Sequence, residues 1–188
     1  GLGFRNNQIN TQSPVHSGTC NACHFGGASG GVGGAVVVAV TDAMNNMVTG
    51  YNPNQVYNVT VTVSDPNATG GGFQIECLDG LNAKAGSFTA GTGSRTTTIG
   101  AFQVAEHNAR KAFVGNSTSW TFSWTAPSTA GASLTFYASG NAVNSNGGTS
   151  GDSPYNNSLP FASLPVVFTT VEAMVYNNQV ELLWETED

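Results

Sequence analysis

Charged side chains are scarce in this chain of 188 residues, with five basic residues against eleven acidic ones. The resulting net charge of −6 argues against nucleic acids and anionic membranes as partners, because both require a cationic surface. No apolar run approaches the roughly 20 residues that a membrane-spanning helix needs. We therefore expect no nucleic-acid partner and no insertion into a membrane.

Histidine and cysteine occur only three times each. No Ser/His/Asp or paired-carboxylate arrangement stands out, so there is little material for a hydrolytic site. We expect a protein that is not an enzyme. The chain contains 24 glycines and abundant Thr, Ser, Asn and Val. This composition is typical of short strands joined by tight polar turns. The predicted fold class is all-β.

The most specific motif is the pentapeptide Cys20-Asn21-Ala22-Cys23-His24, which has the C-x-x-C-H pattern of a c-type haem attachment site. Covalent attachment requires two thiols spaced to add to the two vinyl groups of one porphyrin, followed directly by a histidine that binds the iron. We therefore predict one haem c, bound covalently by Cys20 and Cys23, with His24 as an axial ligand.

Three alternatives to haem attachment remain open for this motif. A zinc site needs two more ligands and would have to bring the adjacent Cys23 and His24 onto one small ion. A thioredoxin-type redox pair belongs where a strand gives way to a helix, but the flanking residues 17–19 and 25–27 show no helical periodicity. A short-loop disulfide suits a secreted protein but gives no role to His24.

Residues 1–30, which carry the motif, show almost no hydrophobic periodicity and are rich in Gly, Asn and Ser. We expect an irregular arm whose missing apolar core is supplied by the haem. Because bacteria attach haem c after export, the motif also predicts an extracellular or cell-surface protein.

Alternating patterns predict the strands that follow this arm. In Val56–Ser64 every second residue is apolar, and in Ser119–Thr125 the residues Trp120, Phe122 and Trp124 share one face, as expected for half-buried antiparallel strands around a core. Further strands, or strand pairs, are predicted at 35–40, 73–79, 94–104 and 133–140.

Smaller features receive simpler interpretations. The period of the strand 73–79 places Cys77 in the core as a buried thiol. Gly70–Gly72 lacks the strand-to-helix setting of a phosphate loop and is interpreted as a turn, as is Gly30–Gly34. Gly151-Asp152 is interpreted as a turn in which the Asp side chain caps the backbone.

Two stretches carry a family resemblance: Ser119-Trp120-Thr121-Phe122-x-Trp124-x-Ala126-Pro127 and Phe136-Tyr137-Ala138-x-Gly140-Asn141-Ala142. With their surroundings, over about residues 13–168, they resemble the reelin-type (Reeler) domain and, more closely, its bacterial relatives known as choice-of-anchor V domains, which often carry C-x-x-C-H just before the domain. The resemblance implies an immunoglobulin-like antiparallel β-sandwich at residues 31–168 in an exported protein.

The C-terminal segment, residues 169–188, contains two strand-like runs outside the sandwich pattern. Its part 171–184 resembles the start of C-terminal regions in proteins exported by the type IX system of Bacteroidetes, which implies a sorting module or an intersubunit strand. Val180, Leu182 and Trp184 fall on one face, which would be apolar and exposed on an isolated subunit. We expect a homo-oligomer or filament built by such strands.

The second axial ligand of the iron is predicted from a short set of candidates: His107, His16, Met44, Met47 and Met174. The resemblance favours His107, because the family often has a histidine in a T-H-T context at this position, although Glu106 and Asn108 replace the flanking threonines here. His16 is the alternative, since it lies only four residues before Cys20 and could serve an adjacent subunit.

Two functional hypotheses follow. The first is a one-haem extracellular cytochrome that transfers electrons to redox partner proteins or to neighbouring copies of itself. The second is a structural or adhesive surface module in which the haem mainly staples the arm to the sandwich.

Overall fold

The structure is a computed structural model that describes residues 8–26, 33–164, 168–176 and 179–186. Within these residues the helical structure consists of one short 3-10 turn, η1 (Cys20–Ala22), and no helix is long and apolar enough to span a membrane. The strands are β1 (Phe25–Gly26), β2 (Ala35–Thr41), β3 (Gly50–Tyr51), β4 (Val56–Ser64), β5 (Gly70–Asp79), β6 (Ser87–Thr89), β7 (Ser94–Ile99), β8 (Phe102–His107), β9 (Lys111–Ala112), β10 (Ser117–Thr125), β11 (Ser133–Val143), β12 (Ser150–Ser163), β13 (Phe168–Tyr176) and β14 (Gln179–Thr186).

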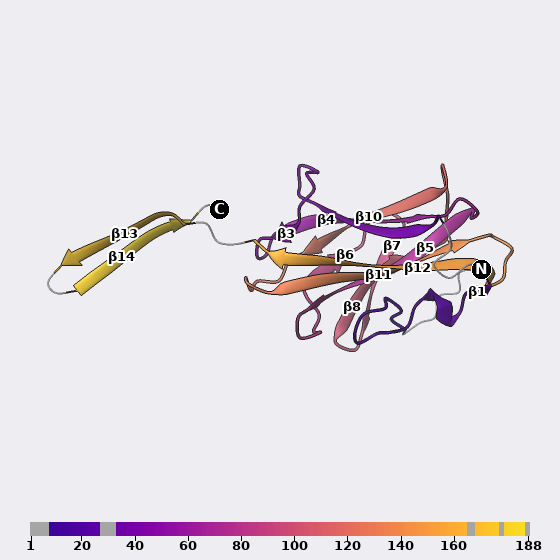
Figure 1. The fold of residues 1–188 in the computed structure, drawn as a ribbon, viewed down its shortest axis with the longest axis horizontal. Helices are drawn as coiled ribbons and strands as arrows, with labels where there is room; N and C mark the ends of the chain where they lie inside the picture. The colour runs from indigo at the N-terminus through magenta and orange to yellow at the C-terminus, as the bar shows by residue number, and fades with distance from the viewer. Residues whose placement is uncertain (1–7, 27–32, 165–167, 177–178, 187–188) are drawn as a thin grey trace.

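Two sheets form a β-sandwich (Figure 1). The larger sheet has the order β1-β12-β11-β5-β8-β7, with β3 beside β12 and β9 beside β5, and the smaller sheet has the order β2-β4-β10-β6. The long pairings are antiparallel, which confirms the predicted all-β sandwich. The two-residue strands β1 and β3 depart from that pattern, since both pair with β12 in parallel.

The core lies between the sheets and is rich in aromatic side chains, as the alternating patterns predicted. Trp120, Phe122 and Trp124 of β10 are buried and face Phe73 of β5 and Phe136 of β11. Ring pairs at 4.9–5.5 Å and in tilted or offset arrangements add to the stabilisation from burial. The sheets therefore form a rigid support for whatever binds on their outer faces.

The sequence patterns located most strands but missed part of the large sheet. β4 has the predicted bounds, and the segment 94–104 is a strand pair, β7 and β8. The turn interpretation of Gly70–Gly72 is wrong, because these residues begin β5 and pair with β11. Strand β12 was not predicted at all. Of the second predicted glycine turn, residues 30–32 lie outside the described residues, whereas Gly33 does lie in a turn.

The N-terminal arm packs on the outer face of the large sheet, opposite the core. Glu76 of β5 is fully buried there and accepts a hydrogen bond from Thr11, while the arm's His16 places Nδ1 3.0 Å from both carboxylate oxygens. Gln74, two residues earlier on the same face, accepts from the backbone N–H of Asn10 at 2.6 Å. The arm thus docks largely through polar contacts.

The C-terminal strands β13 and β14 pair only with each other in a two-stranded sheet, with Trp184 opposite Val171 and Leu182 opposite Ala173. In Figure 1 this hairpin projects from the end of the sandwich that is remote from β1. The two strand-like runs therefore do lie outside the sandwich. The hairpin begins at Phe168, one residue before the expected boundary.

Candidate functional site

The C-x-x-C-H motif forms a compact turn against the large sheet. Cys20 to Ala22 make the 3-10 turn η1, and the carbonyl of Cys20 accepts from the backbone N–H of Cys23 at 3.2 Å and of His24 at 2.9 Å. The hydroxyl of Thr19 caps the turn by accepting from the N–H of Asn21 at 3.1 Å. Turn η1 contacts β11 and β12, and β1 then continues as a strand beside β12.

The two motif cysteines are free thiols in partly exposed positions. Burial of the sulfur atom raises the pKa of Cys20 to about 12, a backbone hydrogen bond opposes this rise, and the nearby Cys23 adds to it. The two thiols are thus close to one another on the same turn. Cys77 is buried in the core, where desolvation and then Glu76 raise the pKa of its thiol, so the prediction of an unreactive core thiol is confirmed.

His24 is held by a buried carboxylate. Its Nδ1 lies 2.7 Å from Oδ2 of Asp152, and the two side chains belong to residues that are 7% and 1% exposed. The other oxygen of Asp152, Oδ1, accepts from the backbone N–H of Asn144 at 3.2 Å. A carboxylate on Nδ1 fixes the imidazole orientation and leaves Nε2 as the nitrogen for a metal, which is the usual support of a metal-ligating histidine.

Asp152 is the residue of the candidate site that no sequence pattern indicated. It lies in strand β12 and not in a turn, so the interpretation of Gly151-Asp152 as a capped turn is wrong. Gly151 does have a positive φ of 77°, a conformation that glycine adopts readily, but it lies within the strand. No sequence signal links Asp152 to His24, because they are 128 residues apart.

His107, the predicted second ligand, lies at the end of β8 with its ring against Gly72. Its Nδ1 is 2.9 Å from the carbonyl oxygen of Phe73 and 3.0 Å from the backbone nitrogen of the same residue. A Cβ atom on Gly72 would come within 2.6 Å of Nε2. Only glycine therefore leaves room for this ring.

Burial lowers the pKa of His107, while the hydrogen bond to Phe73 and the charge of Glu106 oppose that shift. Arg95 and His24 lower the pKa further. A neutral imidazole is the form that binds iron. The strand register places Gly72, against which His107 packs, opposite Asn141, and Asn141 lies opposite Pro154, two residues after Asp152.

The alternative ligands lie elsewhere. His16 contacts Glu76 through Nδ1 and packs edge-on against Phe102 at 4.5 Å, so its clearest role is to dock the arm. Met44 and Met47 are exposed around the loop that follows β2, and Met174 is exposed on the hairpin. None of these three methionines is enclosed as an axial ligand of a buried haem would be.

Asn141 of β11 is a buried polar side chain that the sequence analysis mentioned only within a family motif. It is 2% exposed, and neither Nδ2 nor Oδ1 has a hydrogen-bond partner among the described residues. Asn141 lies opposite Gly72 on one side and Pro154 on the other. It therefore occupies the strand between the one that carries Asp152 and the one against which His107 packs.

These residues fit a haem c. The porphyrin supplies four nitrogen ligands, so the protein needs to provide only two axial ligands and two thiols, and no group of three or more potential metal-ligating side chains is found in the described part of the chain. The orphaned amide of Asn141 also indicates a polar group that is missing from its surroundings, because buried amides are normally hydrogen-bonded.

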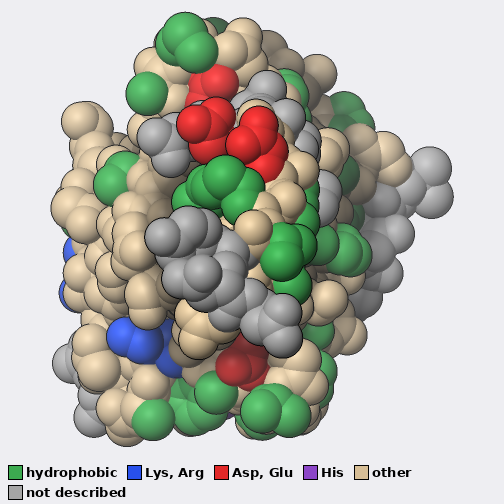
Figure 2. All heavy atoms as spheres, turned by 90° about the vertical axis from the view of Figure 1, so that its left-hand side faces the viewer, with side chains coloured by type: hydrophobic (Ala, Val, Ile, Leu, Met, Phe, Trp, Pro, Cys, Tyr) green, Lys and Arg blue, Asp and Glu red, His purple; other side chains and the backbone are tan. Residues whose placement is uncertain are grey.

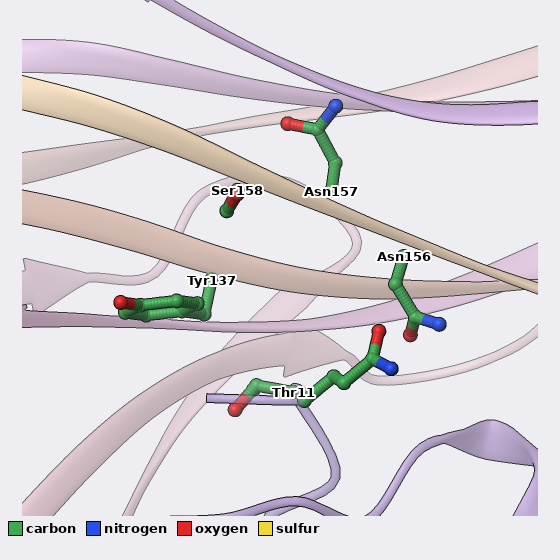
Figure 3. A pocket seen from close by; sticks show the side chains of 6 residues that line it. Thr11, Tyr137, Asn156, Asn157 and Ser158 are labelled. Atoms are coloured by element: carbon green, nitrogen blue, oxygen red, sulfur yellow. The ribbon is translucent and has the colours of Figure 1, made fainter. Parts of the chain in front are cut away.

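A separate pocket of about 160 Å³ lies between the arm and the strands β11 and β12 (Figure 3). Its lining is neutral and polar: Thr11, Gln12, Tyr137, Asn156, Asn157 and Ser158. None of the motif residues takes part. The pocket therefore marks a second gap beneath the arm and is distinct from the surroundings of His24.

No protein-family model and no curated protein matches this chain. Among solved structures it is similar to the Reelin-N domain of F-spondin, with 16% identity, 78% of this chain and 96% of that chain covered, and a TM-score of 0.47. It is also similar to the human F-spondin reeler domain (fragment 2; 16% identity, 82% and 99% covered, TM-score 0.46) and to the seventh ScaB type I cohesin from Pseudobacteroides cellulosolvens (11% identity, 70% and 94% covered, TM-score 0.41). Likeness at this level assigns neither a family nor a function.

Proposed function

We propose that this chain is an exported c-type cytochrome that carries one haem, bound covalently through Cys20 and Cys23, and transfers electrons outside the cytoplasm. The observation that supports this proposal best is the buried 2.7 Å contact between His24 and Asp152. A disulfide or a thioredoxin-type pair would give this histidine no role. A metal-ligating histidine, in contrast, requires such a partner.

When bound, the haem supplies reversible one-electron chemistry at its iron. The chain's own residues would hold and orient the two histidine ligands. Asp152, 2.7 Å from Nδ1 of His24, would orient that imidazole so that Nε2 is left to bind the iron, and the backbone of Phe73 would orient His107 through its Nδ1. On this side of the sheet Glu76, Asn141 and Asp152 are buried.

The direct test is a mass measurement on the denatured wild-type protein, purified from an export-competent host with haem-attachment machinery. We expect the chain mass plus one haem, and a pyridine haemochrome spectrum of the c type. Cys20→Ala and Cys23→Ala should each reduce covalent attachment, whereas Cys77→Ala, a matched cysteine control outside the motif, should not. A bare chain mass for the wild type would refute the proposal.

A second candidate function is a structural module in which the haem fastens the arm to the sandwich. The polar docking of the arm through Glu76 and Gln74 favours it, because such contacts contribute modestly and an apolar plate would add to them. Hydrogen exchange of residues 8–26 in oxidised and reduced protein separates the two roles. A haem that cannot be reduced reversibly, but whose loss releases the arm, would favour the structural role.

We further propose that subunits associate head to tail through the C-terminal hairpin, with a second copy of this chain as the partner. The hairpin exposes apolar side chains, including Val175, Leu182 and Trp184. It also carries only acidic charges in its described part, at Glu172, Glu181 and Glu185. Figure 2, drawn from the side on which the hairpin lies, shows hydrophobic and acidic side chains close together.

The complementary charge lies at the other end of the sandwich. Arg110 and Lys111 are exposed next to the start of β5, which pairs with the end of β11 near β1 and the motif. Two acidic hairpins would repel each other, whereas an acidic hairpin and this basic edge attract. Such a contact joins different surfaces on the two copies, so it propagates into a filament and places each hairpin near the next subunit's haem.

A further inference from the structure

The buried amide of Asn141 has no partner among the side chains that flank it in the sheet. Gly72 on one neighbouring strand has no side chain, and Pro154 on the other has no polar side-chain atom. At 2% exposure Asn141 is also withdrawn from bulk water. A buried amide without a hydrogen bond destabilises the folded protein. Its partner must therefore come from the space above this face of the sheet, beneath the arm.

That space belongs to the haem if the proposed function holds, and this inference rests on it. Besides the axial positions of the iron, a haem c offers hydrogen-bonding groups only at its two propionate carboxylates. The axial positions are assigned to His24 and His107, and asparagine is not among the usual haem ligands. The group left for Asn141 is a propionate.

The chain has few basic side chains, and this favours a neutral side chain as hydrogen-bond donor to the propionates. Propionates are commonly paired with cations, but the whole chain has only five Lys and Arg. Of these, Arg95 is engaged by Glu106 at 2.9 Å, and the exposed Arg110 donates to Ser145 at 2.9 Å. An uncharged amide such as that of Asn141 is therefore a suitable hydrogen-bond donor to the carboxylates.

We propose that Nδ2 of Asn141 donates a hydrogen bond to a haem propionate and is a positioning residue that tunes the reduction potential. A propionate that loses this donor presents more negative charge to the iron, and negative charge stabilises the ferric state. The midpoint potential of the haem therefore depends on Asn141, although this residue does not touch the iron.

The test uses the holoprotein with Asn141→Leu, which keeps the size of the side chain and removes its hydrogen bonds. We expect a denatured mass that still includes the haem, an unchanged low-spin spectrum, a lowered midpoint potential and a shifted propionate bending band in the resonance Raman spectrum. Asn141→Ala, which cannot overpack, should act in the same direction and covers a failure of the leucine variant to fold. Asn52→Leu, an exposed position in the loop after β3, is the matched control.

An unchanged midpoint potential and Raman band in both haem-loaded Asn141 variants would overturn the inference. An equal shift in Asn52→Leu would do the same, because the effect would then be unspecific. If Arg110→Gln shifts the midpoint potential and the Raman band and the Asn141 variants do not, the propionate is bound by Arg110 and the inference is also wrong. A wild type without haem would instead refute the proposed function, so the two failures are distinguishable.

Discussion

His24 and Asp152 are joined across 128 residues by a buried contact of 2.7 Å between Nδ1 and Oδ2. One residue belongs to the irregular arm and the other to strand β12 of the large sheet. This contact fixes the orientation of the motif histidine on the sandwich. It makes the candidate site a joint product of the arm and the domain.

Loss of the Asp152 charge should raise the midpoint potential of the haem. A carboxylate on Nδ1 makes the imidazole a stronger electron donor and so stabilises ferric iron. We expect Asp152→Asn to raise the potential and Asp152→Leu to raise it further, with the haem still attached, as measured by spectroelectrochemistry. Asp42→Asn, in the loop after β2, serves as the control, and identical potentials for all of these proteins would contradict this role.

Removal of His107 should change the spin state of the iron. We expect His107→Ala to convert a six-coordinate low-spin haem into a high-spin one, while His16→Ala leaves the absorption and EPR spectra unchanged. The bis-histidine wild type should also have a lower potential than a His/Met haem. A His107→Ala protein that stays six-coordinate and low-spin excludes this ligand, and a high-spin His16→Ala protein would assign the position to His16.

A methyl group at Gly72 should displace His107 without altering the histidine itself. Since the added Cβ would lie 2.6 Å from Nε2, Gly72→Ala forces the ring to move, and overpacking of this kind costs about 1–3 kcal/mol of stability. Chemical denaturation should show that loss, together with the spectral change expected of His107→Ala. Gly80→Ala is the control, because no atom lies within 4 Å of its added Cβ. Equal behaviour of the two variants would show that the ring is not confined as described.

Polar substitutions on the hairpin should abolish self-association. Leu182→Ser with Trp184→Ser removes exposed apolar surface from β14 and should leave the sandwich folded, since the hairpin pairs only with itself. Sedimentation velocity should show larger species for the wild type and monomers for the variant.

Arg110→Glu with Lys111→Glu should have the same effect on self-association if the contact is head to tail, and added salt should weaken the wild-type assembly. A wild type that is monomeric at all concentrations tested would rule out the hairpin contact. Assembly that survives the Arg110 and Lys111 changes but not the hairpin changes would place the partner surface elsewhere.

The local sequence pattern was sufficient to predict a strand wherever one face of that strand packs on the core and the other face is exposed to water. The regular alternation in Val56–Ser64 predicted β4 with its observed bounds, and Trp120, Phe122 and Trp124 correctly indicated the core. The C-x-x-C-H motif is equally local, because its chemistry depends on a fixed spacing of three side chains. Such signals need no knowledge of the rest of the chain.

Only the tertiary structure decided which polar residues join the motif. The arm covers the outer face of β5, β11 and β12, so Glu76, Asn141 and Asp152 are buried on a face that alternation assigns to solvent. β5 is also buried at Gly70–Gly72, where its glycines suggested a turn, because Arg110 and Lys111 lie against Gly70 and the ring of His107 lies against Gly72. The sequence by itself determined the alternating sandwich strands and the motif but not β12, and the folding of a distant arm onto the sheet determined the residues that support His24.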